Sequence, residues 1–208
     1  MTDYLTPAAC GAGEYDEKRS RFLGKVWPVE TEEAARARIE ETRRQYHDAR
    51  HNCFCYLLRD GTVRYGDDGE PQGTAGQPML NLFQGEGLTD LVCVVTRYFG
   101  GVLLGTGGLA RAYAAAAKAA LADAGVQRMA LWKALRVPCP YPLYDRVRRL
   151  LEAQEAVVTG TDYGADVSLS VLVRHDRAEA LQAALTELSA GTLQAEITGE
   201  EFRGVKIK

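Results

Sequence analysis

Hydrophobic positions along the chain follow the spacings of strands and helices in a clear order. Residues 91–98 (LVCVVTRY) are almost continuously apolar, which is typical of a central strand buried on both faces of a sheet. Residues 109–121 instead place Leu109, Tyr113 and Ala116 at helical spacing, which predicts a helix that packs closely on that sheet. The other predicted elements of the first half are a strand at 22–26, a helix at 31–46, a hairpin of strands at 52–58 and 62–65, and a long turn-rich loop at 66–78.

The second half alternates strands and helices more regularly. Every second residue from Val167 to Val173 is aliphatic, which predicts a half-buried strand. The predicted elements are strands at 131–138, 156–164, 166–174 and 192–202 and helices at 143–154 and 177–191. Their order, β-α-β-β-α-β, is the ferredoxin-like pattern. We therefore expect an α+β protein with an N-terminal domain at 1–129 and a ferredoxin-like domain at 130–208.

Composition and charge narrow the class of protein. Hydrophobic residues make up 46% of the 208 residues and charged residues 25%, as in an ordinary soluble globular protein. The net charge of -3 argues against a general electrostatic attraction to nucleic acid. No stretch approaches the roughly 20 apolar residues of a membrane span, and the N-terminus lacks the pattern of a secretory signal. The five scattered cysteines predict reduced thiols in a cytoplasmic protein without a membrane partner.

The segment RYFGGVLLGTGGLARAY (97–113) raises the main functional question. It places a glycine-rich turn between the apolar strand and the alanine-rich helix, where backbone N–H groups and the helix dipole favour an anion. Arg97 and Arg111 would add positive charge. The spacing matches neither a Walker A loop, which needs a lysine, nor the G-x-G-x-x-G loop. The segment is therefore either an anion cradle or a turn that requires glycine for its conformation.

A second candidate segment, GDDGEPQGTAGQP (66–78), brings the carboxylates of Asp67, Asp68 and Glu70 close together. Clustered carboxylates can bind Mg²⁺ or act as general acids and bases. Asp-Gly and Glu-Pro are also ordinary turn sequences, and the spacing is not that of a calcium-binding loop. We expect the turn role for these residues.

His47, His51, Cys53 and Cys55 have the composition of a zinc ligand set but not its spacing. The two cysteines belong to a predicted strand and His47 to the end of a helix, and no familiar zinc pattern fits, so we expect no metal centre. His51 and Cys53 are two residues apart on the strand and share a face. This geometry permits a Cys-His nucleophile pair without requiring one.

Four segments, taken together, resemble the YigZ/IMPACT family of translation-linked proteins. They are KRSRFLGKVWPV (18–29), HNCFCYLL (51–58), DDGEPQGTAGQPML (67–80) and VVTRYFGGVLLGTGGLARAY (94–113). The resemblance covers residues 18 to about 122 in order, and residues 131–208 resemble the family's bacterial ferredoxin-like extension in their pattern.

The resemblance implies a fold and a set of partners. The N-terminal domain would be like the second domain of a ribosomal small-subunit protein and the fourth domain of elongation factor G, and the C-terminal domain like that factor's fifth domain. RNA, the ribosome or a translation factor would be the partner, and no cofactor and no catalytic residue are implied. With the arguments above, the motif positions give an anion- or RNA-binding set of Arg21, Arg97, Gly100, Gly101, Gly105, Thr106, Gly107, Gly108 and Arg111. They also give a set of pocket candidates, His51, Cys53, Asp67, Asp68, Glu70 and Thr74.

Two main functional hypotheses use these residues. The first is an RNA- or ribosome-associated protein that modulates translation, in which the 67–76 and 97–111 loops form one polar surface. The alternative is an enzyme that acts on a small phosphorylated or carboxylated molecule in a pocket between the two loops, with His51 and Asp68 or Glu70 as acid and base. The enzyme requires a concave pocket, whereas RNA binding is compatible with an open surface. A protein-interaction module is a third hypothesis.

Overall fold

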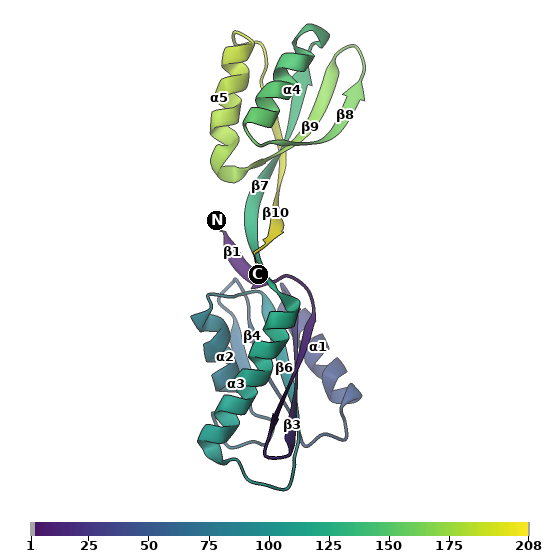
Figure 1. Cartoon of the computed structure of the whole chain (residues 1–208). Coiled ribbons are helices and arrows are strands. Elements are labelled where there is room, and N and C mark those ends of the chain that lie inside the picture. The colour runs from purple at the N-terminus through teal and green to yellow at the C-terminus, as the bar shows by residue number, and fades with distance from the viewer. Residues whose placement is uncertain (1–2, 208) are drawn as a thin grey trace. The chain divides into compact units, whose positions relative to one another are not determined.

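The computed structural model of the chain describes residues 3–207. These residues divide into two compact units (Figure 1). The N-terminal unit contains Tyr4–Met129 and residues 204–207, and the C-terminal unit contains Asp3 and Ala130–Arg203. Each unit buries a hydrophobic core of its own, so each is described by itself.

The N-terminal unit is built on an antiparallel sheet with the strand order β2-β3-β6-β4-β5. The strands are β2 (Gly11–Glu17), β3 (Ser20–Pro28), β4 (His51–Leu57), β5 (Val63–Gly66) and β6 (Leu91–Tyr98). All of β6 except Tyr98 is buried, and β6 lies in the centre of the sheet, as its apolar run predicts. The β4–β5 hairpin is confirmed as well.

Helices cover both faces of this sheet. They are α1 (Glu32–Gln45), α2 (Gly76–Gly85) and α3 (Gly105–Ala124). Side chains alternate along β4, so Cys53 and Cys55 join the core under α2 and α3, while Phe54 and Tyr56 lie in the smaller cluster under α1. Figure 1 shows α1 on one side of the sheet and α3 on the other.

Helix α3 lies unusually close to the sheet because glycines face it. A Cβ added at Gly24 of β3 would collide with the Ala116 carbonyl oxygen, and one added at Gly13 of β2 would lie 2.5 Å from the Ala119 carbonyl carbon. Small residues on both sides therefore bring the backbones of helix and strands together.

Several elements of the N-terminal unit differ from the prediction. Strands β1 (Tyr4–Pro7) and β2 were not expected, and α2 occupies residues that were assigned to the end of a loop or to no element. Helix α3 begins at Gly105 rather than Leu109, because three glycines that the sequence suggested for a turn form its first turn. Glycine is a poor helix former, so helical spacing alone does not include it.

The C-terminal unit has the ferredoxin-like arrangement expected from the sequence. Its elements are β7 (Val126–Cys139), α4 (Tyr144–Ala153), β8 (Val157–Tyr163), β9 (Val167–Arg174), α5 (Ala178–Leu188) and β10 (Glu196–Lys206), with the first residues of β7 and the last of β10 assigned to the N-terminal unit. The strand order is β10-β7-β9-β8. Strand β10 begins four residues later than the predicted strand, at Glu196 rather than Thr192.

Candidate functional site

The centre of the candidate site is a buried ion pair between Arg97 and Glu70. Arg97 is the seventh residue of β6, and its Nη1 donates to Glu70 Oε1 over 2.6 Å. Both side chains are about 95% buried, since their exposed fractions are 5% and 4%. Tyr113 of α3 donates its hydroxyl to the same carboxylate oxygen over 2.9 Å. The pair thus joins the 67–76 segment, β6 and α3 at one point.

Arg97 also holds the turn that precedes β3. Its Nη2 lies 3.3 Å from Ser20 Oγ, and Ser20 Oγ accepts the Gly100 N–H over 3.2 Å. A Cβ at Gly100 would collide with the backbone of Arg19, so only glycine fits there. Gly100 is therefore required for packing, and Ser20 is a member of the site that the sequence did not single out.

His51 lies beside the ion pair. Its Nδ1 is 2.7 Å from the Asp68 carbonyl oxygen, so Nδ1 carries a proton and donates it. Its Nε2 is 3.8 Å from Glu70 Oε1. With Nδ1 protonated, a neutral His51 presents the lone pair of Nε2 on the side of Glu70, which is the arrangement of a group that can accept a proton.

The two aspartates of the acidic segment organise its backbone. Asp67 accepts hydrogen bonds from the N–H groups of Gly73, Ala75 and Gly76, and so satisfies the N-terminus of α2. Asp68 accepts the Asn52 N–H over 2.6 Å. Thr74 is buried, and its hydroxyl donates to the Pro71 carbonyl oxygen. The side chains of Asp67, Asp68 and Thr74 therefore form hydrogen bonds with the protein backbone in this structure.

Cys53 lies behind the site with its Sγ 3.0 Å from the Asp67 carbonyl oxygen and 3.3 Å from the Tyr113 hydroxyl oxygen. Burial raises the pKa of the Cys53 thiol far above its ordinary value, and burial likewise raises the pKa of the Tyr113 hydroxyl. A protonated thiol is a poor nucleophile. Cys53 and Tyr113 therefore connect the carboxylate of Glu70 to the core as neutral groups.

A pocket of about 330 Å³ opens next to the ion pair. It is lined by Arg50, His51, Gly69, Glu70, Pro71, Arg97, Phe99, Leu103, Leu104, Gly105, Thr106 and Leu109. The residue at the N-cap of α3, Leu104, makes no side-chain cap, and no acidic residue lies in the first turn, so N–H groups of this helix end need another partner. Because Arg97 neutralises Glu70, Arg50 leaves the lining positively charged.

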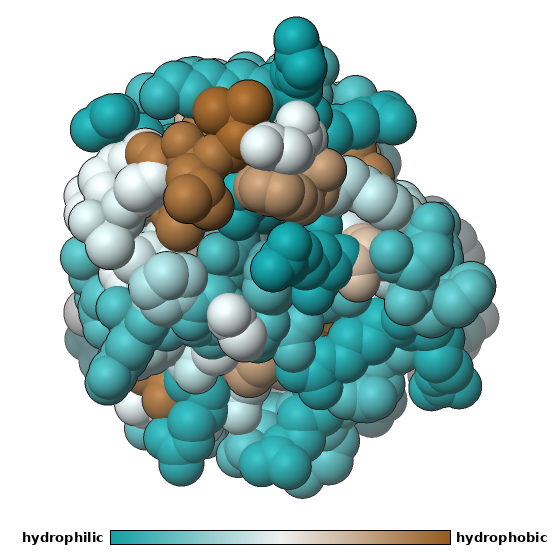
Figure 2. Space-filling model, turned by 90° about the horizontal axis from the view of Figure 1, so that it is seen from below, coloured by the Kyte–Doolittle hydropathy of each residue, from teal (hydrophilic) through white to brown (hydrophobic). Residues whose placement is uncertain are grey.

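Exposed hydrophobic side chains surround the mouth of this pocket. Phe99, Val102 and Leu103 of the β6–α3 loop are exposed, Leu103 to 82%. The guanidinium groups of Arg50 and Arg97 lie 5.1 and 5.5 Å from the centroid of the Phe99 ring. Figure 2, which views the molecule from the lower end of Figure 1, shows a compact hydrophobic cluster among hydrophilic side chains. This end of the N-terminal unit therefore combines cations with an exposed aromatic ring.

Of the candidate residues, only His51, Glu70, Arg97, Gly105 and Thr106 line the pocket. The others, Arg21, Cys53, Asp67, Asp68, Thr74, Gly100, Gly101, Gly107, Gly108 and Arg111, do not. Arg21 of β3 is exposed and pairs with Glu14 over 2.7 Å, and it does not line the pocket. Arg111 is exposed on α3, where its Nη1 would lie 3.5 Å from a Cβ at Gly107. Arg50, Phe99, Ser20 and Tyr113 belong to the site but were not predicted. Among residues 3–207, no cluster of His, Cys, Asp and Glu side chains is placed to hold a metal ion.

Comparison with known proteins explains the motifs. The Impact N-terminal domain matches residues 18–121, which include the pocket, and a further match, the domain of unknown function DUF1949, covers residues 137–192. The chain belongs to the IMPACT family. The family relationship indicates a translation-related regulatory protein.

Relatives in the IMPACT family match along most of the chain. The IMPACT family member YigZ of Escherichia coli is 36% identical over 93% of this chain and 97% of its own length. The IMPACT family member YvyE of Bacillus subtilis is 33% identical over 92% of this chain and 89% of its own length. A crystal structure of a hypothetical protein, 34% identical, covers 96% of this chain and 98% of its own with a TM-score of 0.61. Within residues 3–207, no helix of this family member is long and apolar enough to span a membrane.

Proposed function

We propose that this IMPACT family member binds RNA at the end of the N-terminal unit where the pocket opens, and acts in translation through RNA or the ribosome. The observation that carries the proposal is the uncapped N-terminus of α3 beside Arg50 and the exposed Phe99. Helix N-termini bind phosphate through their free N–H groups, and exposed aromatic rings stack with unpaired bases. One short stretch of single-stranded RNA would supply both a phosphate for the helix N-terminus and an unpaired base for the Phe99 ring.

The roles of the charged residues follow from their exposure. Arg50 and Arg111 are exposed and available to phosphate groups, whereas Arg97 is buried and paired with Glu70. Arg97 therefore positions the loop, and Arg50 and Arg111 contact the RNA. Because the net charge of the chain is negative, most of its surface repels RNA. RNA would therefore bind only at this positively charged end.

Fluorescence anisotropy with a labelled 12-nucleotide single-stranded RNA tests the proposal. Affinity should fall as salt rises, and each lost phosphate contact should reduce the slope of log affinity against log salt by about 0.7. We expect Arg50→Ala and Arg111→Ala to lower that slope and Phe99→Ala to weaken binding by about 1–3 kcal/mol. Co-sedimentation with ribosomes should rank the variants in the same order of affinity.

Arg148→Ala is the matched control, since Arg148 is an exposed helix arginine of the C-terminal unit. Its affinity for RNA should equal that of the unmodified chain. A chain that shows no RNA affinity at low salt, or Arg50 and Arg111 variants that behave like the control, would remove the proposal.

The pocket also supports a second candidate function, an enzyme that acts on a small phosphorylated or carboxylated molecule. The specific observation is His51, whose Nε2 lies 3.8 Å from Glu70 in a concave site of about 330 Å³. In this role His51 accepts a proton, and the α3 N-terminus holds the anionic group of the substrate. Screening phosphate and carboxylate esters should give turnover that His51→Gln abolishes. Turnover that survives His51→Gln would rule this candidate out.

A further inference from the structure

The turn between β2 and β3 carries two cations at the end of the N-terminal unit where the pocket opens. The cross-strand pair of Glu17 and Ser20 closes this hairpin, so its loop consists of Lys18 and Arg19 alone. Both of these side chains are exposed, and neither lines the pocket. Figure 1 shows the turn at the lower end of the unit, which is the end that Figure 2 views.

The backbone of this turn is strained. Lys18 has a φ of 46° and Arg19 a φ of 68°, in the left-handed region that residues with a Cβ rarely adopt. Two-residue hairpin loops with positive φ at both positions favour Asn-Gly, because asparagine and glycine tolerate that region. Backbone strain of this kind concentrates at functional sites. The lysine and the arginine therefore occupy positions where Asn-Gly would make a more stable turn.

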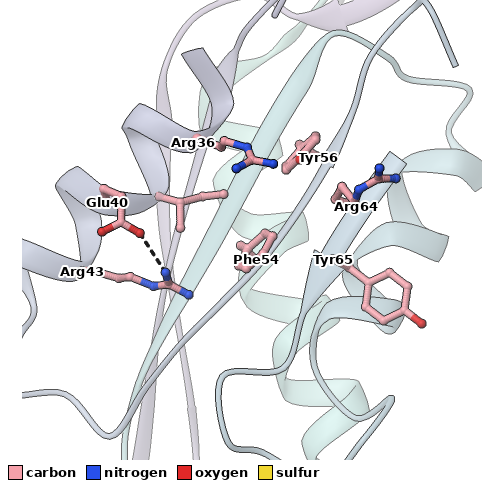
Figure 3. A pocket seen from close by; sticks show the side chains of 8 residues that line it. Arg36, Glu40, Arg43, Phe54, Tyr56, Arg64 and Tyr65 are labelled. Carbon is pink, nitrogen blue, oxygen red and sulfur yellow. Dashed lines mark hydrogen bonds and ion pairs between the residues drawn. The ribbon is translucent and has the colours of Figure 1, made fainter. Parts of the chain in front are cut away.

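The two cations of the turn are available to a ligand. Elsewhere in the N-terminal unit, arginines pair with nearby carboxylates, and Figure 3 shows one such pair, Arg43 and Glu40 of α1, at a distance of 2.8 Å. Within residues 3–207, Lys18 and Arg19 form no ion pair of this kind. An incoming phosphate would therefore not have to displace a carboxylate from either side chain.

The acidic side chains of the hairpin are engaged along its stem. Glu14 pairs with Arg21 over 2.7 Å, and Asp16 lies opposite Arg21 in the strand register. Glu17 accepts the Tyr15 hydroxyl over 3.2 Å. The carboxylates thus belong to the stem of the hairpin, and the two cations occupy its tip.

Contacts with the glycine-rich loop fix the turn beside the candidate site. A Cβ at Gly100 would collide with the Arg19 backbone, so the turn and the loop touch directly. Ser20 Oγ accepts the Gly100 N–H over 3.2 Å and lies 3.3 Å from Arg97 Nη2. Gly100 directly follows Phe99, the exposed ring of the site. An RNA whose base stacks on Phe99 therefore has the turn beside it.

We propose that the Lys18–Arg19 turn is a second phosphate-binding element of the RNA site, outside the pocket, and that its strained conformation holds both cations at the tip. The role of the turn rests on the proposed function and extends it to the phosphodiester backbone next to the stacked base. Phosphate contacts from lysine and arginine supply most of the affinity of sequence-independent RNA binding. Arg97 acts as a positioning residue, since it contacts Ser20 and not the RNA.

A double substitution, Lys18→Asn with Arg19→Gly, separates the contact with RNA from the stability of the turn. It gives the hairpin its preferred sequence, so thermal unfolding should show a Tm higher by about 2–4 °C. In the anisotropy titration with the 12-nucleotide RNA, the slope of log affinity against log salt should fall by about 1.4, or about 0.7 for each lost phosphate contact. A turn with a purely structural role would gain the stability and bind RNA with an unchanged slope.

Three further variants locate the effect. Lys18→Gln alone should lower the slope by about 0.7. Lys18→Arg with Arg19→Lys keeps both charges and should keep the slope of the unmodified chain. Arg128→Ala is the matched control, because Arg128 is an exposed arginine of the same unit that forms no ion pair within residues 3–207. Arg128 follows the C-terminal end of the 20-residue helix α3, about 30 Å from the end where the pocket opens, and its loss should leave the slope unchanged.

Three outcomes would overturn the inference. The first is an unchanged slope for Lys18→Asn with Arg19→Gly while Arg50→Ala lowers it, in which case the RNA proposal stands without the turn. The second is an equal loss of affinity for the variant that keeps both charges, which would assign the effect to the shape of the turn. The third is an unmodified chain without RNA affinity at low salt, which removes the RNA proposal as well.

Discussion

Glu70 and Arg97 depend on one another, because each is buried and charged. Glu70 receives hydrogen bonds from Arg97 and from Tyr113, whereas Arg97 Nε has no hydrogen-bond partner among residues 3–207. Loss of the carboxylate would leave the whole guanidinium group without a counter-charge in the protein interior. Such a loss is far more costly than the loss of a surface pair.

We therefore expect Glu70→Ala to lower the free energy of unfolding by about 3–5 kcal/mol, measured by urea denaturation. Glu14→Ala is the control, since the Glu14–Arg21 pair has nearly the same length, 2.7 Å, but is exposed. Its loss should change the free energy of unfolding by at most about 1 kcal/mol. Equal effects of the two substitutions would contradict a structural role for the buried pair.

Buried thiols make stability depend on pH at the alkaline end. Burial raises the pKa of Cys55 and Cys93 well above the ordinary value of 9.0. The folded chain therefore keeps protons that the unfolded chain releases, and the free energy of unfolding should fall as pH rises above about 9, by about 1.4 kcal/mol per pH unit for each thiol. Below that pH both the folded and the unfolded chain keep these thiols protonated. The thiols then do not make the free energy of unfolding depend on pH.

Cys93→Ala tests this dependence because it removes one such proton. Urea denaturation between pH 7 and 10.5 should give a curve for Cys93→Ala that declines less steeply above pH 9 than that of the unmodified chain, by about 1.4 kcal/mol per pH unit. An unchanged slope would show that the thiol ionises equally in both states.

Close contact between α3 and the sheet depends on glycine in the strands. Gly24→Ala should lower the free energy of unfolding by about 1–3 kcal/mol, because its Cβ would collide with the Ala116 carbonyl oxygen. Gly85 at the end of α2 is the control, since a Cβ added there would meet nothing within 4 Å apart from its chain neighbours and the nearby backbone of its own helix. Gly85→Ala should have little effect or stabilise slightly. Thermal unfolding of both variants measures the difference.

Elements with a strong local pattern of apolar residues could be predicted from the sequence, and elements without one could not. Strand β6 and the core face of α3 were predicted because apolar residues mark them without ambiguity. Strand β2 was missed because its residues, GAGEYDE, are glycine-rich and polar, and its fit to α3 depends on distant residues. Helix α2 was missed because its first turn contains Gly76 and Pro78 and its N-terminus is satisfied by Asp67 from outside the helix.

The candidate site shows the same division. Sequence motifs identified both Arg97 and Glu70, but their pairing depends on the fold of the 67–76 segment against β6, which no local pattern determines. Arg50 was missed because it lies between elements, and Tyr113 was assigned only to the core face of α3. The hollow between α1 and β5, lined in part by Arg43, Phe54 and Arg64, was missed entirely, because it depends on how far α1 extends over Phe54.

The hydrophobic cores of the two units share no buried residue in the described chain. Leu181→Ala, at a fully buried position of the C-terminal unit, should therefore reduce the stability of that unit by about 2–5 kcal/mol. Hydrogen exchange should become faster in α5 and β9 while the amides of β6 keep their protection. Equal acceleration in β6 would mean that the units unfold together.

The last part of the chain returns to the N-terminal unit, where the Ile207 N–H donates to the Val126 carbonyl oxygen over 2.8 Å. The chain therefore departs from this unit after Met129 and re-enters it at Gly204 beside the strand that it left. In topological terms, Ala130–Arg203 is an insertion at the tip of a β-hairpin. A protein in which a short Asn-Gly turn joins residue 129 to residue 204 should retain the complete N-terminal unit, including its returning strand, which a simple truncation would remove.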